Sequence, residues 1–420
     1  MISRRTLVAS SIAAPVFLRT LSAAAQDKVT LKIAGIGYDY SQTAVDTFQA
    51  AHPELNVEWA EGALVFEDGS LQTVLQSGEG PDVINVSSGP GRVGLLASSG
   101  LILSLDDFYN RSGIAEKYQP GVVEQIRAQN ADGQIYEIVE GLDVFQIYYW
   151  TDTFEEAGVA VPTTWDEFLA GLRTLKESGT TPIVLGARDN FQGGWFAGGI
   201  LQASMGRDAM TDVIYGGGAF NQPNTVRAAE HLKQLVDEEY ISGLEAAALT
   251  GDQADAAFAE RQGVMKVAGQ GFPISLTNDG VDISKLSSFL FPPLNEGQAA
   301  APTAGLAHSW VVNATTKQIG AVESWLEFVA SDEYLQVAAT KGGALVPARI
   351  VPAEVTLSTW VQDAATKLAV GAGYNPSVYF PAAAKDAWYA AIQMILTDQA
   401  SPQEAVDAIQ AAFDESRAAS

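Results

Sequence analysis

Hydrophobic and polar residues alternate along residues 28–36, which predicts a β-strand with one buried face. Apolar residues then recur at helical spacing from Ser41 until Pro53, which predicts a helix that ends before the proline. Residues 55–59 and the short apolar run 82–86 predict two further strands, with a short helix between them. The order strand, helix, strand, helix, strand is typical of an open α/β sheet.

A second group of elements follows the same rhythm further along the chain. Residues 143–149 predict a strand rich in Val, Phe, Ile and Tyr, and residues 182–185 predict another. Between them, Thr164 and Glu167 have the spacing of a capping box at the start of a helix, and residues 401–404 repeat that pattern near the end of the chain. A chain of 420 residues exceeds the roughly 250–300 at which single cores stop growing. Because no linker divides it, we expect two interleaved α/β lobes.

Charge and composition exclude several classes of function. The chain has 24 Lys and Arg against 50 Asp and Glu, a formal charge of −26, which argues against binding to nucleic acid or to an anionic membrane surface. There is no cysteine, so disulfides, thiolate nucleophiles and cysteine-based zinc sites are excluded. The three histidines, His52, His231 and His308, lie far apart in sequence, and no cofactor or metal is expected.

The first 25 residues have the features of a secretory signal. Arg4 and Arg5 precede an apolar run at residues 7–18, and small residues follow at 22–25, so we expect cleavage near Ala25. The paired arginines leave both the general secretory route and the twin-arginine route open. No later stretch has about 20 uninterrupted apolar residues, so no membrane insertion is expected. Since no cysteine is available for lipid attachment, the pattern predicts a free protein of the periplasm.

Two enzymatic alternatives need weighing. Residues 89–94 fit the G-x-G-x-x-G pattern after a predicted strand, and Asp106 follows, as in an NAD(P)-dependent oxidoreductase. However, Pro90 removes an N–H group that would bind phosphate, which favours a glycine-rich turn at the edge of a cleft. Glu140 and Asp143 could serve as the paired acids of a glycosidase, although close acids arise by chance in so acidic a chain. An exported oxidoreductase remains the main alternative.

Several short motifs, in this order, resemble the extracellular solute-binding proteins of ABC-type sugar importers, the family that includes maltose-binding protein. The motifs are Gly80–Ile84, Ile147–Gly158, Pro162–Phe168, Gly263–Met265 ahead of Gly269, Val312–Lys317 and Ser401–Phe413. Each motif is weak alone, but the ordered set is specific and spans residues 28–415. Trp150 departs from the pattern, because the family usually has asparagine there.

The resemblance implies an α/β fold of the two-lobe periplasmic binding protein type (type II), with interleaved lobes and a hinge of several segments. The implied division is 1–25 as signal peptide, 26–143 and 297–343 as the first lobe, and 144–296 and 344–420 as the second. It further implies a monomeric protein without catalytic activity. Such a protein captures a carbohydrate or polyol between its lobes and, once closed, docks on the transmembrane subunits of an ABC permease.

A sugar site needs flat aromatic faces and polar groups that bind hydroxyls. The resemblance places Asp143, Gln192, Trp195, Gln270, Phe272 and Trp388 in the cleft, with Phe272 where the family usually has tryptophan. Tyr38, Ser87, Ser88 and His308 are added because they lie at predicted strand ends or in loops at the cleft edge. Each aromatic candidate could instead belong to the core, and each polar one to an ordinary surface or structural site. No arginine or lysine stands out among them, which favours a neutral sugar or polyol over a phosphate or sugar acid.

Overall fold

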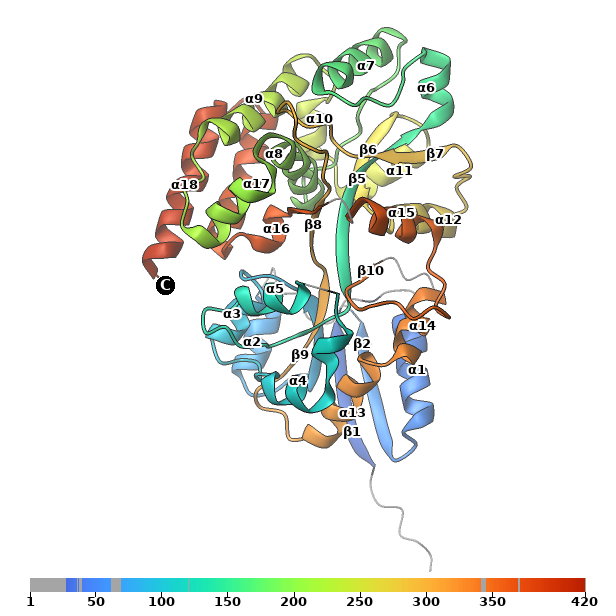
Figure 1. Cartoon of the computed structure of the whole chain (residues 1–420), viewed down its shortest axis with the longest axis vertical. Helices are drawn as coiled ribbons and strands as arrows, with labels where there is room; N and C mark the ends of the chain where they lie inside the picture. Colours follow the sequence, from blue (N-terminus) through green and yellow to red (C-terminus); the bar gives the residue numbers. More distant parts are fainter. Residues whose placement is uncertain are drawn as a thin grey trace, which may run out of the picture.

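The computed structural model describes residues 28–35, 37, 40–61, 69–119, 121–340, 345–368 and 371–419. These residues form two α/β lobes, each built on its own β-sheet, and the long strand β5 (Gly141–Trp150) extends from one lobe into the other (Figure 1). The predicted fold class, a two-lobe α/β protein, is confirmed.

The first lobe contains a five-stranded sheet in the order β2-β1-β3-β9-β4. Its strands are β1 (Val29–Gly35), β2 (Leu55–Glu61), β3 (Val83–Ser87), β4 (Ile138–Val139) and β9 (His308–Val312). Strands β1, β2 and β3 are parallel, whereas β9 runs antiparallel to β3 and β4. The first three strands therefore lie where the alternation of hydrophobic residues predicts them.

Helices cover this sheet and bury its apolar side chains. They are α1 (Ser41–Ala51), α2 (Ser70–Gln76), α3 (Val93–Ser98), α4 (Asp106–Ser112), the 3₁₀ turn η1 (Ile114–Lys117), α5 (Val122–Ala128), α13 (Ile319–Val329) and α14 (Asp332–Thr340). Leu31 and Ile33 of β1 pack in one core with Phe48 of α1 and Trp325 of α13. This joins the start of the chain to a segment nearly 300 residues later.

The second lobe is built around β5. Its other strands are β6 (Met265–Gly269), β7 (Leu286–Phe289), β8 (Thr303–Leu306), β10 (Val346–Pro347) and β11 (Gly373–Tyr374). The order is β10-β5-β8-β11, and β6 and β7 pair with the far end of β5. The strand predicted at 182–185 is wrong: only Ile183 forms a bridge, to Met265. Pro182 has no N–H to donate, so this segment cannot build a full ladder.

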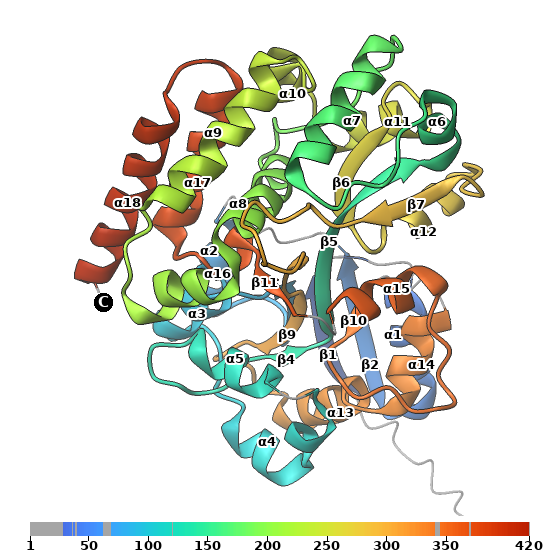
Figure 2. The same ribbon diagram turned by 45° about the horizontal axis from the view of Figure 1, so that its top comes forward.

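Most helices belong to the second lobe. They are α6 (Thr151–Ala157), α7 (Trp165–Glu177), α8 (Phe191–Thr211), the π-helical turn η2 (Asp212–Gly216), α9 (Pro223–Asp237), α10 (Gly243–Ala248), α11 (Gly251–Ala259), α12 (Phe272–Asn278), α15 (Thr359–Leu368), α16 (Pro376–Tyr379), α17 (Ala382–Leu396) and α18 (Pro402–Ala419). Helices α8, α9, α17 and α18 pack together on one side of this lobe (Figure 2). Both predicted capping boxes are confirmed, at Thr164 and at Ser401.

At two places the chain crosses between the sheets within a single residue. Only Glu140 separates β4 of the first sheet from β5 of the second, and only Ala307 separates β8 from β9. Strand β8 lies in the second sheet, although residues 297–343 are assigned to the first lobe by the sequence, so the lobe boundaries stay a prediction. None of the described helices is both long and apolar enough to cross a membrane.

Candidate functional site

A cavity of about 410 Å³ lies where the end of the first sheet faces the second lobe. Its walls come from β5, the start of α8, α11, the turn between β6 and α12, and the first residue of β9. This volume lies in the range of about 300–1,000 Å³ that is usual for small-molecule sites. Six of the ten candidates from the sequence line it: Asp143, Gln192, Trp195, Gln270, Phe272 and His308.

Aromatic rings form one wall of the cavity. The ring of Trp195 stacks on Phe145 of β5, with centroids 4.7 Å apart and an angle of 27° between the planes. Phe191, which is 44% exposed, continues this surface 6.2 Å from Trp195. Two glycines before Trp195 let α8 pack closely, since a Cβ on Gly194 would lie 2.7 Å from the ring of Tyr389. The tryptophan is thereby left partly exposed at the cavity instead of being buried in the core.

Asp143 and Gln270 form a fixed polar pair beside this wall. The Oε1 atom of Gln270 accepts a hydrogen bond of 2.7 Å from the backbone N–H of Val144, and its amide group also bonds to the carboxylate of Asp143. Burial raises the pKa of Asp143 to about 6, and the hydrogen bond from Gln270 partly opposes this shift. The carboxylate is thus a partly desolvated acceptor whose orientation is set before any ligand arrives.

A second polar cluster reaches the cavity wall from α8 and α11. The ammonium of Lys266 is 2.8 Å from Oδ1 of Asp255 and donates a hydrogen bond to Oε1 of Gln192. The Nε2 atom of Gln192 donates to the same Asp255 oxygen at 3.0 Å. Nearby, Oδ2 of Asp189 accepts from the backbone N–H of Gly251 at 3.0 Å. Asp255, Asp189 and Asp252 all line the cavity.

His308 reaches the cavity from the first sheet. Burial, together with the positive charge of Arg92, lowers the pKa of His308 to about 3. The imidazole is therefore neutral at ordinary pH and offers one N–H donor and one ring-nitrogen acceptor.

Three of the remaining candidates do not line this cavity. Ser87 lies beside His308 in the sheet, paired with it between β3 and β9. Ser88 is fully buried and donates hydrogen bonds to Glu137 and Gln129, at 3.1 and 3.2 Å.

Trp388 belongs to the hydrophobic core of the second lobe, where its ring packs edge-on against Phe380. It is 6% exposed, because α17 turns this side chain towards α8 and α18. The fourth, Tyr38, lies outside the described residues.

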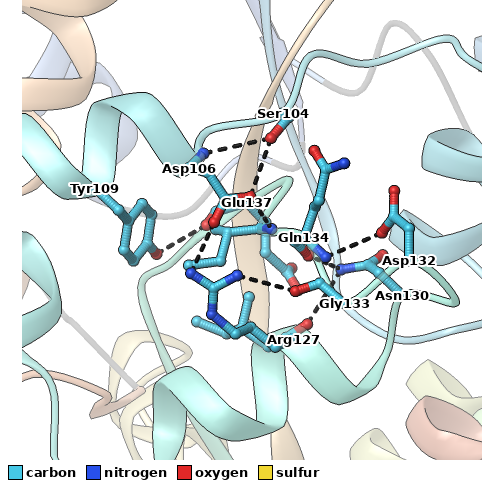
Figure 3. A network of polar contacts seen from close by, with 11 residues as sticks. Ser104, Asp106, Tyr109, Arg127, Asn130, Asp132, Gly133, Gln134 and Glu137 are labelled. Carbon is cyan, nitrogen blue, oxygen red and sulfur yellow. Dashed lines mark hydrogen bonds and ion pairs between the residues drawn. The ribbon is translucent and has the colours of Figure 1, made fainter.

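Residues 89–94 form a packed turn between the lobes. A Cβ on Gly89 would lie 2.2 Å from the carbonyl oxygen of Val378, and the guanidinium of Arg92 donates to the carbonyl oxygen of Ser377 at 2.8 Å. Asp106 has structural partners, because its carboxylate forms an ion pair of 2.7 Å with Arg127 (Figure 3) and accepts a hydrogen bond from the backbone N–H of Ile135. The oxidoreductase alternative is therefore not supported.

The glycosidase alternative requires Glu140 and Asp143 to line one cavity, and they do not. Trp310, Asn85, Tyr40 and Tyr334 all donate hydrogen bonds to the carboxylate of Glu140. Glu140 does not line the cavity that contains Asp143. In the described part of the chain, no cluster of three or more His, Asp or Glu side chains is arranged to hold a metal ion.

Several lining residues were missed by the sequence analysis. Phe145 and Phe191 flank named candidates, so proximity in sequence was an available signal. Asp189, Asp252 and Asp255 had no such signal, because an isolated aspartate in an acidic chain looks like any surface acid.

Comparison with known proteins agrees with this architecture. The chain belongs to the family of bacterial extracellular solute-binding proteins, whose profile matches residues 35–336. The predicted family is thereby confirmed. Among curated proteins, the chain is similar to a multiple sugar-binding protein of Streptococcus mutans, with 24% identity over 333 residues, covering 74% of this chain and 73% of that protein.

Solved structures show the same fold. A chitin oligosaccharide binding protein superposes with a TM-score of 0.81 at 21% identity, covering 94% of this chain and all of that one. The solute-binding protein RafE in complex with raffinose superposes with a TM-score of 0.73 at 18% identity, covering 92% of this chain and 99% of its own.

Proposed function

We propose that this protein binds a sugar or polyol in the 410 Å³ cavity and delivers it to an ABC importer. The observation that carries the proposal is the stacked aromatic wall of Trp195 and Phe145 beside the fixed pair of Asp143 and Gln270 in one cavity. The C–H face of a pyranose packs on an indole ring, and its hydroxyls bind carboxylate and amide groups. The sugar-binding relatives support this assignment.

Closure of the two lobes would follow from the position of His308. This residue belongs to the first sheet, whereas the other lining residues that bear on the ligand come mostly from the second lobe. A ligand that contacts both sides gains more contacts when the lobes approach, and so stabilises the closed form. The closed form would then be recognised by the transmembrane subunits of an ABC permease.

Export and the absence of catalysis complete the proposal. The leader at residues 1–25 would direct the chain to the periplasm, where it acts as a monomer without enzymatic activity. Cell fractionation would test the location, and size-exclusion chromatography coupled to light scattering would test the monomeric state. Protein found in the cytoplasm, or as a stable dimer, would contradict them.

The decisive experiment measures ligand binding by isothermal titration calorimetry. The panel contains raffinose, N,N′-diacetylchitobiose, xylobiose, galactose, galactitol, galacturonate and NAD(P). At 100 times its dissociation constant, a ligand should also stabilise the protein by about 2.7 kcal/mol in thermal melts. Binding of a neutral sugar or polyol is expected, whereas binding of NAD(P) alone would refute the proposal.

Two tryptophan variants locate the binding site. Trp195→Ala should weaken binding by about tenfold or more, because it removes the stacking surface. Trp360→Ala is the matched control: Trp360 is also partly buried and packs on an aromatic ring of β5, Tyr148, at 6.0 Å, but it does not line the cavity. Equal losses in the two variants would show that the ligand binds elsewhere.

A further inference from the structure

Lys266 is a buried cation directly behind the wall of the ligand cavity. It lies on β6 and is only 1% exposed. Its ammonium contacts Asp255 at 2.8 Å, donates to Gln192, and lies 5.8 Å from the ring centroid of Phe272. Three residues that line the cavity are thus held by one side chain that does not line it.

The cavity itself is rich in negative charge. Four carboxylates line it, and no lysine or arginine does so among the described residues. The lining carboxylates are Asp143, Asp189, Asp252 and Asp255. Of the ion pairs formed by the described part of the chain, only that of Lys266 with Asp255 involves one of these four. Burial lowers the pKa of Lys266, and the attraction of Asp255 and Asp189 opposes this effect.

We propose that Lys266 tunes the charge preference of the cavity, because its ammonium shifts the balance between a neutral sugar and the same sugar carrying an amine towards the neutral sugar. This inference rests on the proposed sugar-binding function and assigns to it a specificity-determining residue. Lys266 acts through Asp255 and Gln192, so it is a positioning residue and not a direct contact.

The hydrogen-bond pattern explains why the ammonium matters. Lys266 occupies Oε1 of Gln192, and Asp255 receives Nε2 of the same amide, so the orientation of Gln192 is fixed. The second oxygen of Asp255 is left as an acceptor at the cavity, which suits a hydroxyl donor. Without the ammonium, this end of the cavity would hold an additional uncompensated negative charge. A ligand amine would then take over the role of the missing cation.

Lys367 provides a matched control. It is also largely buried, with 17% of its side chain exposed, and contacts Asp363 at 2.6 Å and Oε1 of Gln146 at 2.8 Å. This lysine therefore holds an aspartate and a glutamine as Lys266 does, but it does not line or contact the cavity wall. Replacement of Lys367 therefore shows how the loss of any buried lysine affects ligand binding.

The test compares neutral and aminated ligands that are otherwise alike. Dissociation constants are measured by calorimetry for galactose against galactosamine, and for cellobiose against chitobiose, two pairs in which amines replace 2-hydroxyl groups. The ratio of the two constants in the unmodified protein is the reference value. In Lys266→Met, the ratio of the two constants should shift towards the amine by about 10- to 100-fold, the usual effect of one charge-assisted hydrogen bond. Lys367→Met should leave the ratio unchanged.

Variants of Asp255 separate charge from structural damage. Lys266→Met combined with Asp255→Asn removes both charges, and should return the ratio to that of the unmodified protein. Asp255→Asn alone should shift the ratio further towards the neutral sugar, which keeps the test available if Lys266→Met does not fold. A merely structural role for Lys266 would weaken both ligands equally and leave every ratio constant.

The outcomes distinguish this inference from the function on which it rests. If the unmodified protein binds no sugar of the panel, the proposed function fails and the role of Lys266 fails with it. If the unmodified protein binds neutral sugar and the ratio is the same in Lys266→Met, only the role assigned to Lys266 is overturned. A ratio that shifts in Lys367→Met as much as in Lys266→Met also overturns it.

Discussion

Replacement of Asp143 by asparagine should stabilise the ligand-free protein at neutral pH and at the same time weaken ligand binding. Burial raises the pKa of Asp143 from the ordinary 3.8 to about 6, so the ionised carboxylate is unfavourable in the folded state. Asparagine has nearly the same shape, and its oxygen can still accept the hydrogen bond from Gln270. The substitution therefore removes the cost of ionisation while keeping the local contacts.

The magnitude follows from the shift in pKa. A difference of about 2 units at about 1.36 kcal/mol per unit gives an upper value of about 3 kcal/mol at neutral pH. Because Asp143 retains some exposure to solvent, we expect a gain of about 1–2 kcal/mol. For lobes of this size, 1 kcal/mol corresponds to about 2–4 °C in melting temperature.

The two pKa values of Asp143, folded and unfolded, determine how the stability difference changes with pH. The pKa of Asp143 is higher in the folded state than in the unfolded chain, so between about 4 and 6 the folded protein binds more protons. Its stability therefore falls as pH rises through this window, and the variant lacks this loss. The advantage of Asp143→Asn should be absent near pH 4, grow up to pH 6 and stay constant above it.

Thermal unfolding of both proteins between pH 4 and 8 measures this difference. Asp282→Asn is a control of opposite sign, because a hydrogen bond from the backbone N–H of Ser284 lowers the pKa of Asp282. This control should be less stable than the unmodified protein by an amount that stays constant between pH 4 and 8, because the carboxylate of Asp282 is ionised in both the folded and the unfolded state throughout this range. The reasoning is refuted if Asp143→Asn melts below the unmodified protein at pH 7.5, or if the difference does not vary with pH. Calorimetry with the bound sugar then measures the accompanying loss of affinity.

Two further substitutions test the packing of the fold. Gly89→Ala should destabilise the protein by about 2 kcal/mol or more, because its φ of 125° is strained for alanine and the added Cβ would lie 2.2 Å from the carbonyl oxygen of Val378; a melting temperature equal to that of the unmodified protein would contradict the packed turn. Thr164→Ala should cost about 1 kcal/mol, because the hydroxyl accepts the backbone N–H of Glu167 at the start of α7. Chemical denaturation measures both losses, and no loss in the second variant would show that the capping box is dispensable.

The elements that the sequence predicts correctly are those with local periodic signals. The alternation at β1 and the pair Thr164 and Glu167 each depend on residues within a few positions, and both occur in the structure as predicted. The prediction at 182–185 was wrong because an apolar run shows burial, but it does not show whether a neighbouring strand can complete the ladder.

The resemblance marked most of the candidates that line the cavity, and His308 was named from its place at the predicted cleft edge. Trp195, Asp143 and Gln270 lie in motifs of the family, and the structure brings them to one cavity. Trp388 was a helical tryptophan for which core and ligand readings were both open, and only the packing of α17 places it in the core. Asp255 and Lys266 lie 11 residues apart on a helix and a strand, so their ion pair depends on how these elements meet, which no local pattern reports.

Burial makes the ionisation of several groups unfavourable, among them Glu137, Glu140 and Lys367 away from the cavity and three groups at the cavity. Burial raises the pKa of Asp143, lowers that of His308 and lowers that of Lys266, and these three groups lie in or directly behind one cavity. A core serving stability alone would gain by exchanging such groups for apolar residues of similar size. Their retention around an aromatic wall is explained if the bound ligand supplies the missing hydrogen bonds. If Asp143→Asn raises the stability of the ligand-free protein and weakens ligand binding, Asp143 is retained for binding at the expense of stability.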